Sequence, residues 1–160
     1  MIISTDSKKN IICQNKKARY EYSIEEVFEA GLVLQGTEVK ALRSNKASIQ
    51  EGYISQTDSG LEIVNVTIST YKYTAITKSH NERRSRKLLL HKKEINKITG
   101  LISKKGYTAI PLSLYFNSKG MVKLEFALAK GKKLYDKRAA LKEKSVLLEQ
   151  KKDLKYRIKI

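Results

Sequence analysis

The chain has 160 residues, which is enough for one domain with a hydrophobic core and one appendage, but crowded for two full domains. Its 33 Lys and Arg against 16 Asp and Glu give a formal net charge of +17, which implies an anionic partner: RNA, DNA or an acidic membrane surface. No apolar run reaches the roughly 18 residues of a transmembrane helix and no signal-peptide layout opens the chain, so we expect a cytoplasmic protein.

From about residue 20 to residue 128 the chain predicts short antiparallel strands, because apolar residues recur there with period two between Gly, Asn and Asp. A short helix is expected near residues 15–19. Residues 24–34 form an apolar stretch that Gly31 interrupts, and residues 37–44 fit a helix or a strand equally well. Val64, Val66 and Ile68 repeat the strand pattern after a turn signal at residues 58–60.

One later segment has helical spacing instead. Leu88, Ile95 and Ile98 share one face of the expected helix, with Ser85 as its N-cap and Gly100 just beyond its end. Leu89 lies about 100° around that helix from Leu88, which predicts partial exposure.

A β-hairpin follows. Ile110, Leu112, Leu114 and Phe116 alternate toward one face, a turn is expected at residues 117–120, and Val122, Leu124, Phe126 and Leu128 alternate toward the same face. We therefore predict a mainly β fold: a small, closed antiparallel barrel of the OB type with two or three short helices.

The composition changes after residue 130. Residues 130–160 carry twelve Lys and Arg against four Asp and Glu, so this segment cannot easily fold alone. Residues 139–151 are rich in helix formers, and Leu147, Leu154 and Ile158 recur at helical spacing. We predict a barrel over residues 1–130 and a basic tail over residues 131–160 that is disordered when free and helical when bound.

Catalytic patterns are scarce. His80 and His91 stand in a basic region without a partnered nucleophile, and Cys13, the only cysteine, excludes an intrachain disulfide and a cysteine-based zinc cluster. The paired carboxylates Glu25, Glu26 and Glu29 have the pattern of solvated charges. The sequence therefore predicts a binding protein rather than an enzyme, with no catalytic residue, metal, cofactor or small-molecule substrate.

Basic and aromatic residues instead gather in three clusters, which is typical of nucleic-acid binding. A solvated segment, a solvated helix face and a structural linker are the respective alternatives to RNA contact. The candidate RNA-binding residues are Asn15, Lys16, Lys17, Arg19 and Tyr20 in the first cluster; Arg83, Arg84, Arg86, Lys87 and Lys92 in the second, which spans residues 78–93; and Lys130, Lys132 and Lys133 in the third.

Five motifs in order resemble one family. They are NKKARYEY (15–22), FEAG (28–31), QGTEVKALR (35–43), RKLLLHKKEI (86–95) and LAKGKKLYDKR (128–138), and together they are similar to the SsrA-binding protein family, also called small protein B. The resemblance implies an OB-like barrel that binds the tRNA-like domain of transfer-messenger RNA and delivers it to stalled ribosomes for trans-translation. It also implies that the small ribosomal subunit and its RNA are partners, and we expect a monomer.

The resemblance also assigns roles to single residues. It places Asn15, Glu29 and Leu89 on the RNA surface, with Leu89 as an apolar contact to an unpaired base. It places Asp136, Lys137 and Arg138 at the decoding centre, with Tyr135 stacking on a ribosomal base and the segment beyond becoming helical in the empty mRNA channel.

Three other functions stay open at this point. A general single-strand binder of the OB class would show little RNA preference, and a nuclease would cleave RNA with a metal. A tail that forms a basic amphipathic helix would instead bind membranes.

Overall fold

The computed structural model describes residues 9–70, 79–104 and 106–157, apart from the side chains of residues 135, 140 and 152–157. Lys78, the first residue of the second basic cluster, and Ile158 lie outside this part, as do the side chains of Tyr135 and Leu154. The elements are, in chain order, β1 (Asn10–Gln14), α1 (Ala18–Glu21), β2 (Tyr22–Leu32), α2 (Gly36–Arg43), β3 (Ala47–Ser48), β4 (Tyr53–Thr57), β5 (Gly60–Val64), β6 (Thr67–Ile68), β7 (Arg86–Leu89), α3 (Lys92–Ile102), β8 (Tyr107–Phe116), β9 (Val122–Gly131) and α4 (Leu134–Arg157).

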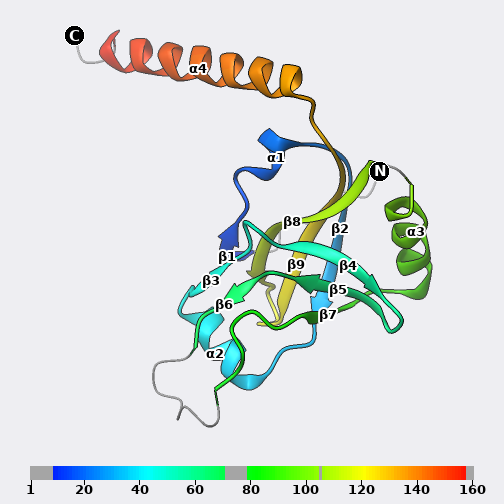
Figure 1. Ribbon diagram of the computed structural model, residues 1–160. Coiled ribbons are helices and arrows are strands. Elements are labelled where there is room, and N and C mark those ends of the chain that lie inside the picture. The colour runs from blue at the N-terminus through cyan, green and yellow to red at the C-terminus, as the bar shows by residue number, and fades with distance from the viewer. Residues whose placement is uncertain (1–8, 71–78, 105, 158–160) are drawn as a thin grey trace.

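Antiparallel strands form most of the domain, which confirms the mainly β prediction. The strand order is β1-β8-β4-β5-β7-β2-β9, and β8 also pairs with β9, so the sheet curls round on itself as Figure 1 shows. Strands β4 and β8 meet only through the pair Ile54 and Ala109, so the barrel is not closed along its full length. Strands β3 and β6 form a separate two-stranded ladder.

The long hairpin of β8 and β9 has two packed faces rather than one. Val122, Leu124, Phe126 and Leu128 point into the barrel core, as predicted. On β8 the prediction is wrong for half of the set, because a bulge between Pro111 and Ser113 reverses the alternation. Leu114 and Phe116 contact the main core, whereas Ile110 and Leu112 join a second cluster on the other face. Ala18 of α1 covers this second cluster, together with Ala127 and Ala129.

The segment around Leu88 differs from the prediction. Residues 86–89 form strand β7 between β5 and β2, with Arg86 and Leu88 buried and the side chains between and after them exposed. The helix begins only at Lys92, where Glu94 accepts a hydrogen bond from the backbone N–H of His91 at 3.1 Å. Gly100 lies inside this helix rather than after its end. The alternation of buried and exposed side chains over residues 86–89 therefore belongs to a strand, and the helical spacing that links Leu88 to Ile95 and Ile98 does not extend the helix to Leu88.

Two smaller ambiguities are also resolved. Residues 36–43 form helix α2 and not a strand. Val64 does not share the face of Val66 and Ile68, because Asn65 adopts a left-handed backbone with φ of 61° and breaks the alternation. Leu61 and Ile63 are the buried residues of β5 instead.

Cys13 belongs to β1 and packs, half-buried, against the main core. Burial raises the pKa of its thiol to about 11, so the sulfur is protonated at neutral pH.

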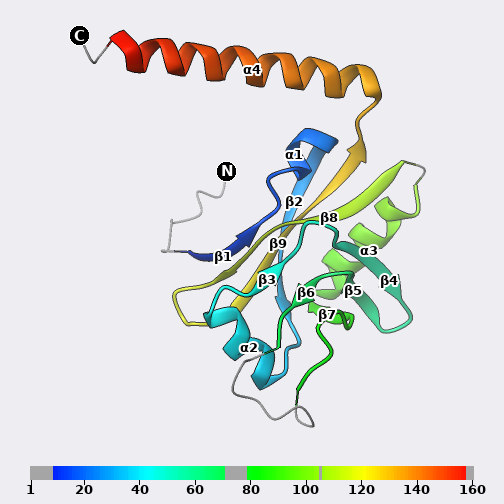
Figure 2. The ribbon, with the colours of Figure 1, turned by 60° about the vertical axis from the view of Figure 1, so that its left-hand side comes forward.

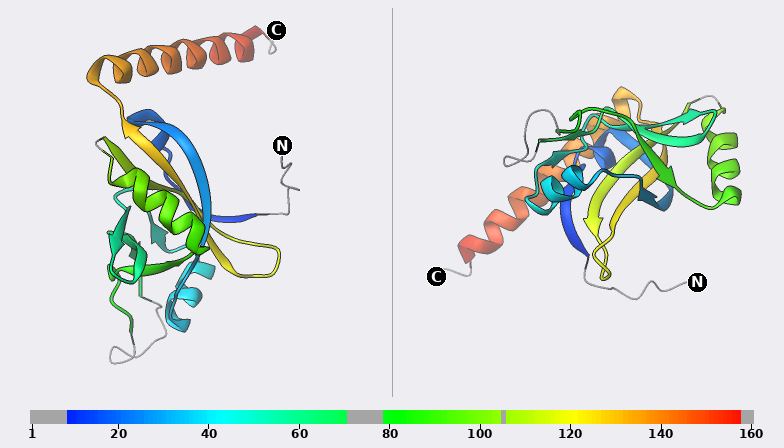
Figure 3. Two further views of the ribbon diagram at one scale, coloured as in Figure 1. Left: turned by 90° about the vertical axis from the view of Figure 1, so that its right-hand side faces the viewer. Right: turned by 90° about the horizontal axis from the view of Figure 1, so that it is seen from below.

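The tail leaves the barrel where β9 ends and forms the 24-residue helix α4. Figure 2 and Figure 3 show α4 standing apart from the barrel, beyond the end that α1 covers. Helix α4, which contacts α1, occupies the segment for which the sequence predicted a helix on binding, and the helix formers of residues 139–151 account for it. Among the described helices none is long and apolar enough to cross a membrane.

Candidate nucleic-acid interface

The first basic cluster surrounds a hollow between α1 and the outer face of the sheet. Asn15 builds it, because its backbone N–H donates to the carbonyl of Leu112 at 2.8 Å and its side-chain oxygen accepts from the N–H of Ala18 at 3.1 Å. These two bonds fix the start of α1 to β8. The residues that line the hollow are Lys9, Ile11, Gln14, Asn15, Lys16, Arg19, Leu112, Ser113 and Glu125.

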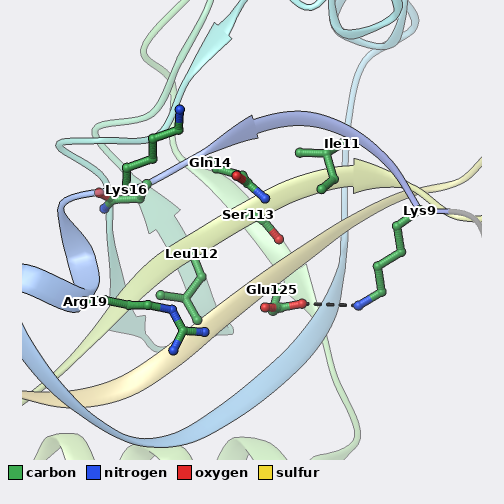
Figure 4. A pocket seen from close by; sticks show the side chains of 9 residues that line it. Lys9, Ile11, Gln14, Lys16, Arg19, Leu112, Ser113 and Glu125 are labelled. Atoms are coloured by element: carbon green, nitrogen blue, oxygen red, sulfur yellow. Dashed lines mark hydrogen bonds and ion pairs between the residues drawn. The ribbon is translucent and has the colours of Figure 1, made fainter. Parts of the chain in front are cut away.

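Positive charge approaches this hollow from two sides (Figure 4). Arg19 reaches from α1 over the sheet beside Leu112, and Lys9 enters from the start of β1. The ammonium of Lys9 pairs with the carboxylate of Glu125 at 3.3 Å, whereas no partner of the Arg19 guanidinium occurs among the described residues. Lys16 and Lys17 are exposed beside it. The hollow therefore offers unpaired cations to an anion such as a phosphate.

Glu29 lies farther along the same outer face, on β2. The hydroxyl of Tyr115 donates a hydrogen bond to Glu29 Oε2, and the ammonium of Lys123 lies 3.5 Å from Oε1. The Lys9 ammonium stands 4.8 Å from the centre of the Tyr115 ring. Lys9 and Tyr115 thus connect the hollow at α1 with Glu29.

Leu89 lies at the other end of this outer face, and 55% of it is exposed. It pairs in register with Gly31 of β2, two residues beyond Glu29. One shallow hollow there is lined by Glu29, Leu89, Leu90, His91, Glu94 and Lys123, and a more apolar one on the other side of Leu89 includes Leu34, Val39 and Met121. The structure therefore brings Asn15, Glu29 and Leu89 onto one continuous surface.

Two arginines of the second cluster do not belong to this surface. Arg86 is 1% exposed, and its guanidinium donates to Glu38 at 2.8 Å and to the carbonyls of Glu82, Arg84 and Val66 at 2.9–3.0 Å. Arg84 donates to both oxygens of Glu38, at 2.9 and 2.5 Å. The expectation that Arg86 faces RNA is thus not met, because its charge neutralises a buried carboxylate.

The electrostatics of this buried group favour the ionised carboxylate. Burial alone would raise the pKa of Glu38, but hydrogen bonds from Arg84, from the backbone N–H of Gln35 and from Arg86 lower it below its usual range. Burial lowers the pKa of Arg86, and the bond to Glu38 opposes that shift. The group joins α2, β7 and the segment before β7.

The remaining predicted residues are scattered around the interface. Arg83, Lys87 and Lys92 are exposed, and Tyr20 is half-buried. Lys130 pairs with Glu25 at 3.3 Å, and Lys132 donates to the carbonyl of Arg19 at 3.1 Å, which fastens the root of the tail to α1. Lys133 is exposed before α4, and Asp136, Lys137 and Arg138 lie in the first turns of this helix, which Figure 1 shows beyond the end of the barrel that α1 covers.

Sequence reasoning missed Lys9, Tyr115, Lys123 and Glu125. The last two alternate with the buried residues of β9, so their outward direction could have been found from the hairpin pattern. The outward direction of Tyr115 also follows from the alternation, because Leu114 and Phe116 on either side of it contact the core as predicted, after the bulge in β8. Within the described part of the chain, no group of three or more His, Cys, Asp and Glu could hold a metal ion.

Comparisons with known proteins point to one family. The model of the SmpB protein family matches residues 12–156. The SsrA-binding protein of Rickettsia prowazekii is 55% identical over 136 residues, which cover 85% of this chain and 89% of the relative. That of Wolbachia pipientis from Culex pipiens is 51% identical over 134 residues, which cover 84% and 89%.

A solved structure is similar as well. One chain of the structure described as "tmRNA-SmpB: a journey to the center of the bacterial ribosome" superposes with a TM-score of 0.66 at 39% identity, covering 81% of this chain and 93% of that chain. The match over nearly the whole length and the five ordered motifs lead to one conclusion: the chain belongs to the SmpB protein family.

Proposed function

We propose that this protein binds the tRNA-like domain of transfer-messenger RNA and delivers it to stalled ribosomes for trans-translation. It acts in the cytoplasm as a binding protein without catalytic activity. Its relatives are SsrA-binding proteins, and SsrA is the transfer-messenger RNA. The partners are therefore this RNA and the small ribosomal subunit with its ribosomal RNA.

The observation that carries the proposal is the continuous outer face from Asn15 to Leu89. The cations Lys16 and Arg19, which have no ion-pair partner among the described residues, stand at its α1 end, and an exposed apolar side chain, Leu89, stands at the other. Cations at one end suit a phosphate backbone, and an apolar side chain suits the face of an unpaired base. A single-stranded or irregular RNA fits this combination better than a regular duplex does.

The tail has a separate role in this proposal. Residues 1–130 bind the RNA, and residues 131–160 occupy the decoding centre and the empty mRNA channel. Asp136, Lys137 and Arg138 stand at the start of α4, where the helix leaves the barrel. The physical separation of α4 from the sheet face supports this division into two modules.

A competition experiment tests the RNA-binding part. The purified full chain is titrated with labelled tRNA-like domain in the presence of excess total tRNA at near-physiological salt. We expect strong preference for the tRNA-like domain. Binding that is indifferent to the competitor and falls steeply with salt would instead identify a general single-strand binder.

A further inference from the structure

The sheet of β2, β8 and β9 contains the same three-residue arrangement twice, once on the side of the barrel core and once on the outer face. In each copy a tyrosine of β8 donates to a glutamate of β2, and a lysine of β9 pairs with that glutamate. The first copy is Tyr107, Glu25 and Lys130, with 2.7 Å between the tyrosine and glutamate oxygens. The second is Tyr115, Glu29 and Lys123. The register explains the repeat, because Tyr107 pairs with Lys130 and Tyr115 with Lys123.

The two copies have different surroundings. Tyr107 is partly exposed at the rim. The ammonium of Lys130 stands 4.4 Å from the centre of the Tyr107 ring and also forms an ion pair with Glu25. Tyr115 is 2% exposed, and a different lysine, Lys9, covers its ring. In the first copy Tyr107, Glu25 and Lys130 therefore all contact one another at the edge of the sheet. The second copy lies between the hollow at α1 and the hollow at Leu89.

Glu29 faces an unusual neighbour for a surface carboxylate. It pairs directly across the strands with Glu125, a second carboxylate. Like charges in this position destabilise a sheet unless other groups compensate them. Lys123 and Lys9 supply that compensation, one to each carboxylate. Two carboxylates at the centre of the face repel phosphate, so this part of the surface suits base edges that carry amino groups.

We propose that Tyr115 is a positioning residue that holds Glu29 in the direction needed to accept a hydrogen bond from an amino group of an unpaired RNA base. The tyrosine fixes Oε2, while among the described residues Oε1 has only the Lys123 ammonium, at 3.5 Å, and belongs to a side chain that is 50% exposed. This inference rests on the proposed function, because the base belongs to the RNA that the protein binds.

The tyrosine is suited to this role at every physiological pH. Burial, the hydrogen bond to Glu29 and the nearby carboxylates of Glu29 and Glu125 together raise the pKa of Tyr115 well above its usual value. The hydroxyl thus stays protonated and donates a hydrogen bond to the carboxylate of Glu29. Without that bond, Glu29 would turn toward Lys123 and its free oxygen would lose its fixed direction.

The test is a double-mutant cycle with a matched control. Four variants are titrated with labelled tRNA-like domain of transfer-messenger RNA and, separately, with unfractionated tRNA. They are Tyr115→Phe, Glu29→Gln, the double variant of these two, and Tyr107→Phe as the control. Tyr115→Phe should weaken binding of the tRNA-like domain about five- to tenfold and leave binding of bulk tRNA unchanged. In the Glu29→Gln background it should have no further effect, and Tyr107→Phe should change neither affinity.

Three results would overturn the inference: losses that multiply in the double variant, an equal loss in Tyr107→Phe, or an unchanged affinity in Tyr115→Phe. Each substitution replaces a single polar atom or group, so we expect every variant to fold. The melting temperature of each variant checks this. If the wild-type chain does not distinguish the two RNAs, the proposed function itself fails. If it does distinguish them and Tyr115→Phe binds normally, only the positioning role of Tyr115 fails.

Discussion

At the scale of single residues, the buried group of Glu38, Arg84 and Arg86 is the most consequential for stability. Glu38 and Arg86 are almost fully buried, so removing one partner leaves a charge without compensation. The carbonyls of Glu82, Arg84 and Val66 would keep their places around Arg86 but could not neutralise it. These two side chains therefore act in folding and not in RNA contact.

Glu38→Gln should lower the free energy of unfolding by about 3–5 kcal/mol at pH 7. The pKa of Glu38 lies below its usual range in the folded chain, so its stabilising effect is complete above the usual carboxyl pKa and is lost as pH falls through the folded value. The difference between wild type and variant should thus stay constant from pH 7 to about 5 and narrow in stronger acid. Urea unfolding at several pH values measures this, and a difference that narrows already above pH 5 would contradict it.

At the scale of elements, the strands were more predictable than their faces. The buried set of β9 follows directly from alternation, and so does the turn before it, where Gly120 has a φ of 75°. The place of Ile110 and Leu112 could not be predicted, because a bulge arises from pairing between strands and leaves no local pattern. The outward direction of Tyr115 does follow from its predicted neighbours Leu114 and Phe116, but its bond to Glu29 depends on the pairing of β8, β9 and β2. Arg86 was misplaced because a buried arginine and an exposed one look alike in sequence.

Gly100 lies in the last turn of α3, two residues before its end, is exposed, and has open space around it. Gly100→Ala should therefore raise the free energy of unfolding by about 0.5–1 kcal/mol, since alanine loses less backbone entropy in a helix. RNA affinity should not change. Thermal unfolding and the RNA titration check both statements, and a lower melting temperature would indicate that the residue packs against something.

Gly31 allows β2 and β7 to lie close together. A Cβ atom at this position would stand 3.3 Å from the Cβ of Leu89, so Gly31→Ala should push Leu89 away by a few tenths of an ångström. We expect severalfold weaker binding of the tRNA-like domain with little loss of stability. Gly36→Ala, where no atom lies within 4 Å of the added Cβ, is the matched control. Equal effects of the two substitutions would show that Leu89 is not the cause.

At the scale of the whole molecule, the basic residues are distributed between the barrel and the tail, and the two parts are separate in space. Residues 130–160 hold twelve of the 33 Lys and Arg, yet α4 stands away from the sheet face. Leu141, Val146, Leu147 and Leu148 are each at least half exposed on α4, so these four apolar side chains of the described part of the helix lie open to solvent. The composition changes at residue 130, next to the end of β9 at Gly131, and the division into barrel and tail that this change indicates stays a prediction.

Changing Asp136, Lys137 and Arg138 together to Ala should separate the two modules. These residues lie outside the sheet face, so affinity for the tRNA-like domain should remain within about twofold of wild type. Peptide tagging at stalled ribosomes should be lost, because the tail could no longer occupy the decoding centre. Titration and an in vitro tagging assay measure the two effects, and a parallel decline of both would refute two modules.

Because Cys13 is the only cysteine and its thiol is protonated and half-buried, the chain offers an almost silent background for fluorescent labelling. A cysteine introduced at the exposed Ser145 of α4 would take a maleimide dye far faster than Cys13. Energy transfer from a dye on the RNA could then follow, in real time, how the tail swings relative to the barrel while a ribosome is being rescued.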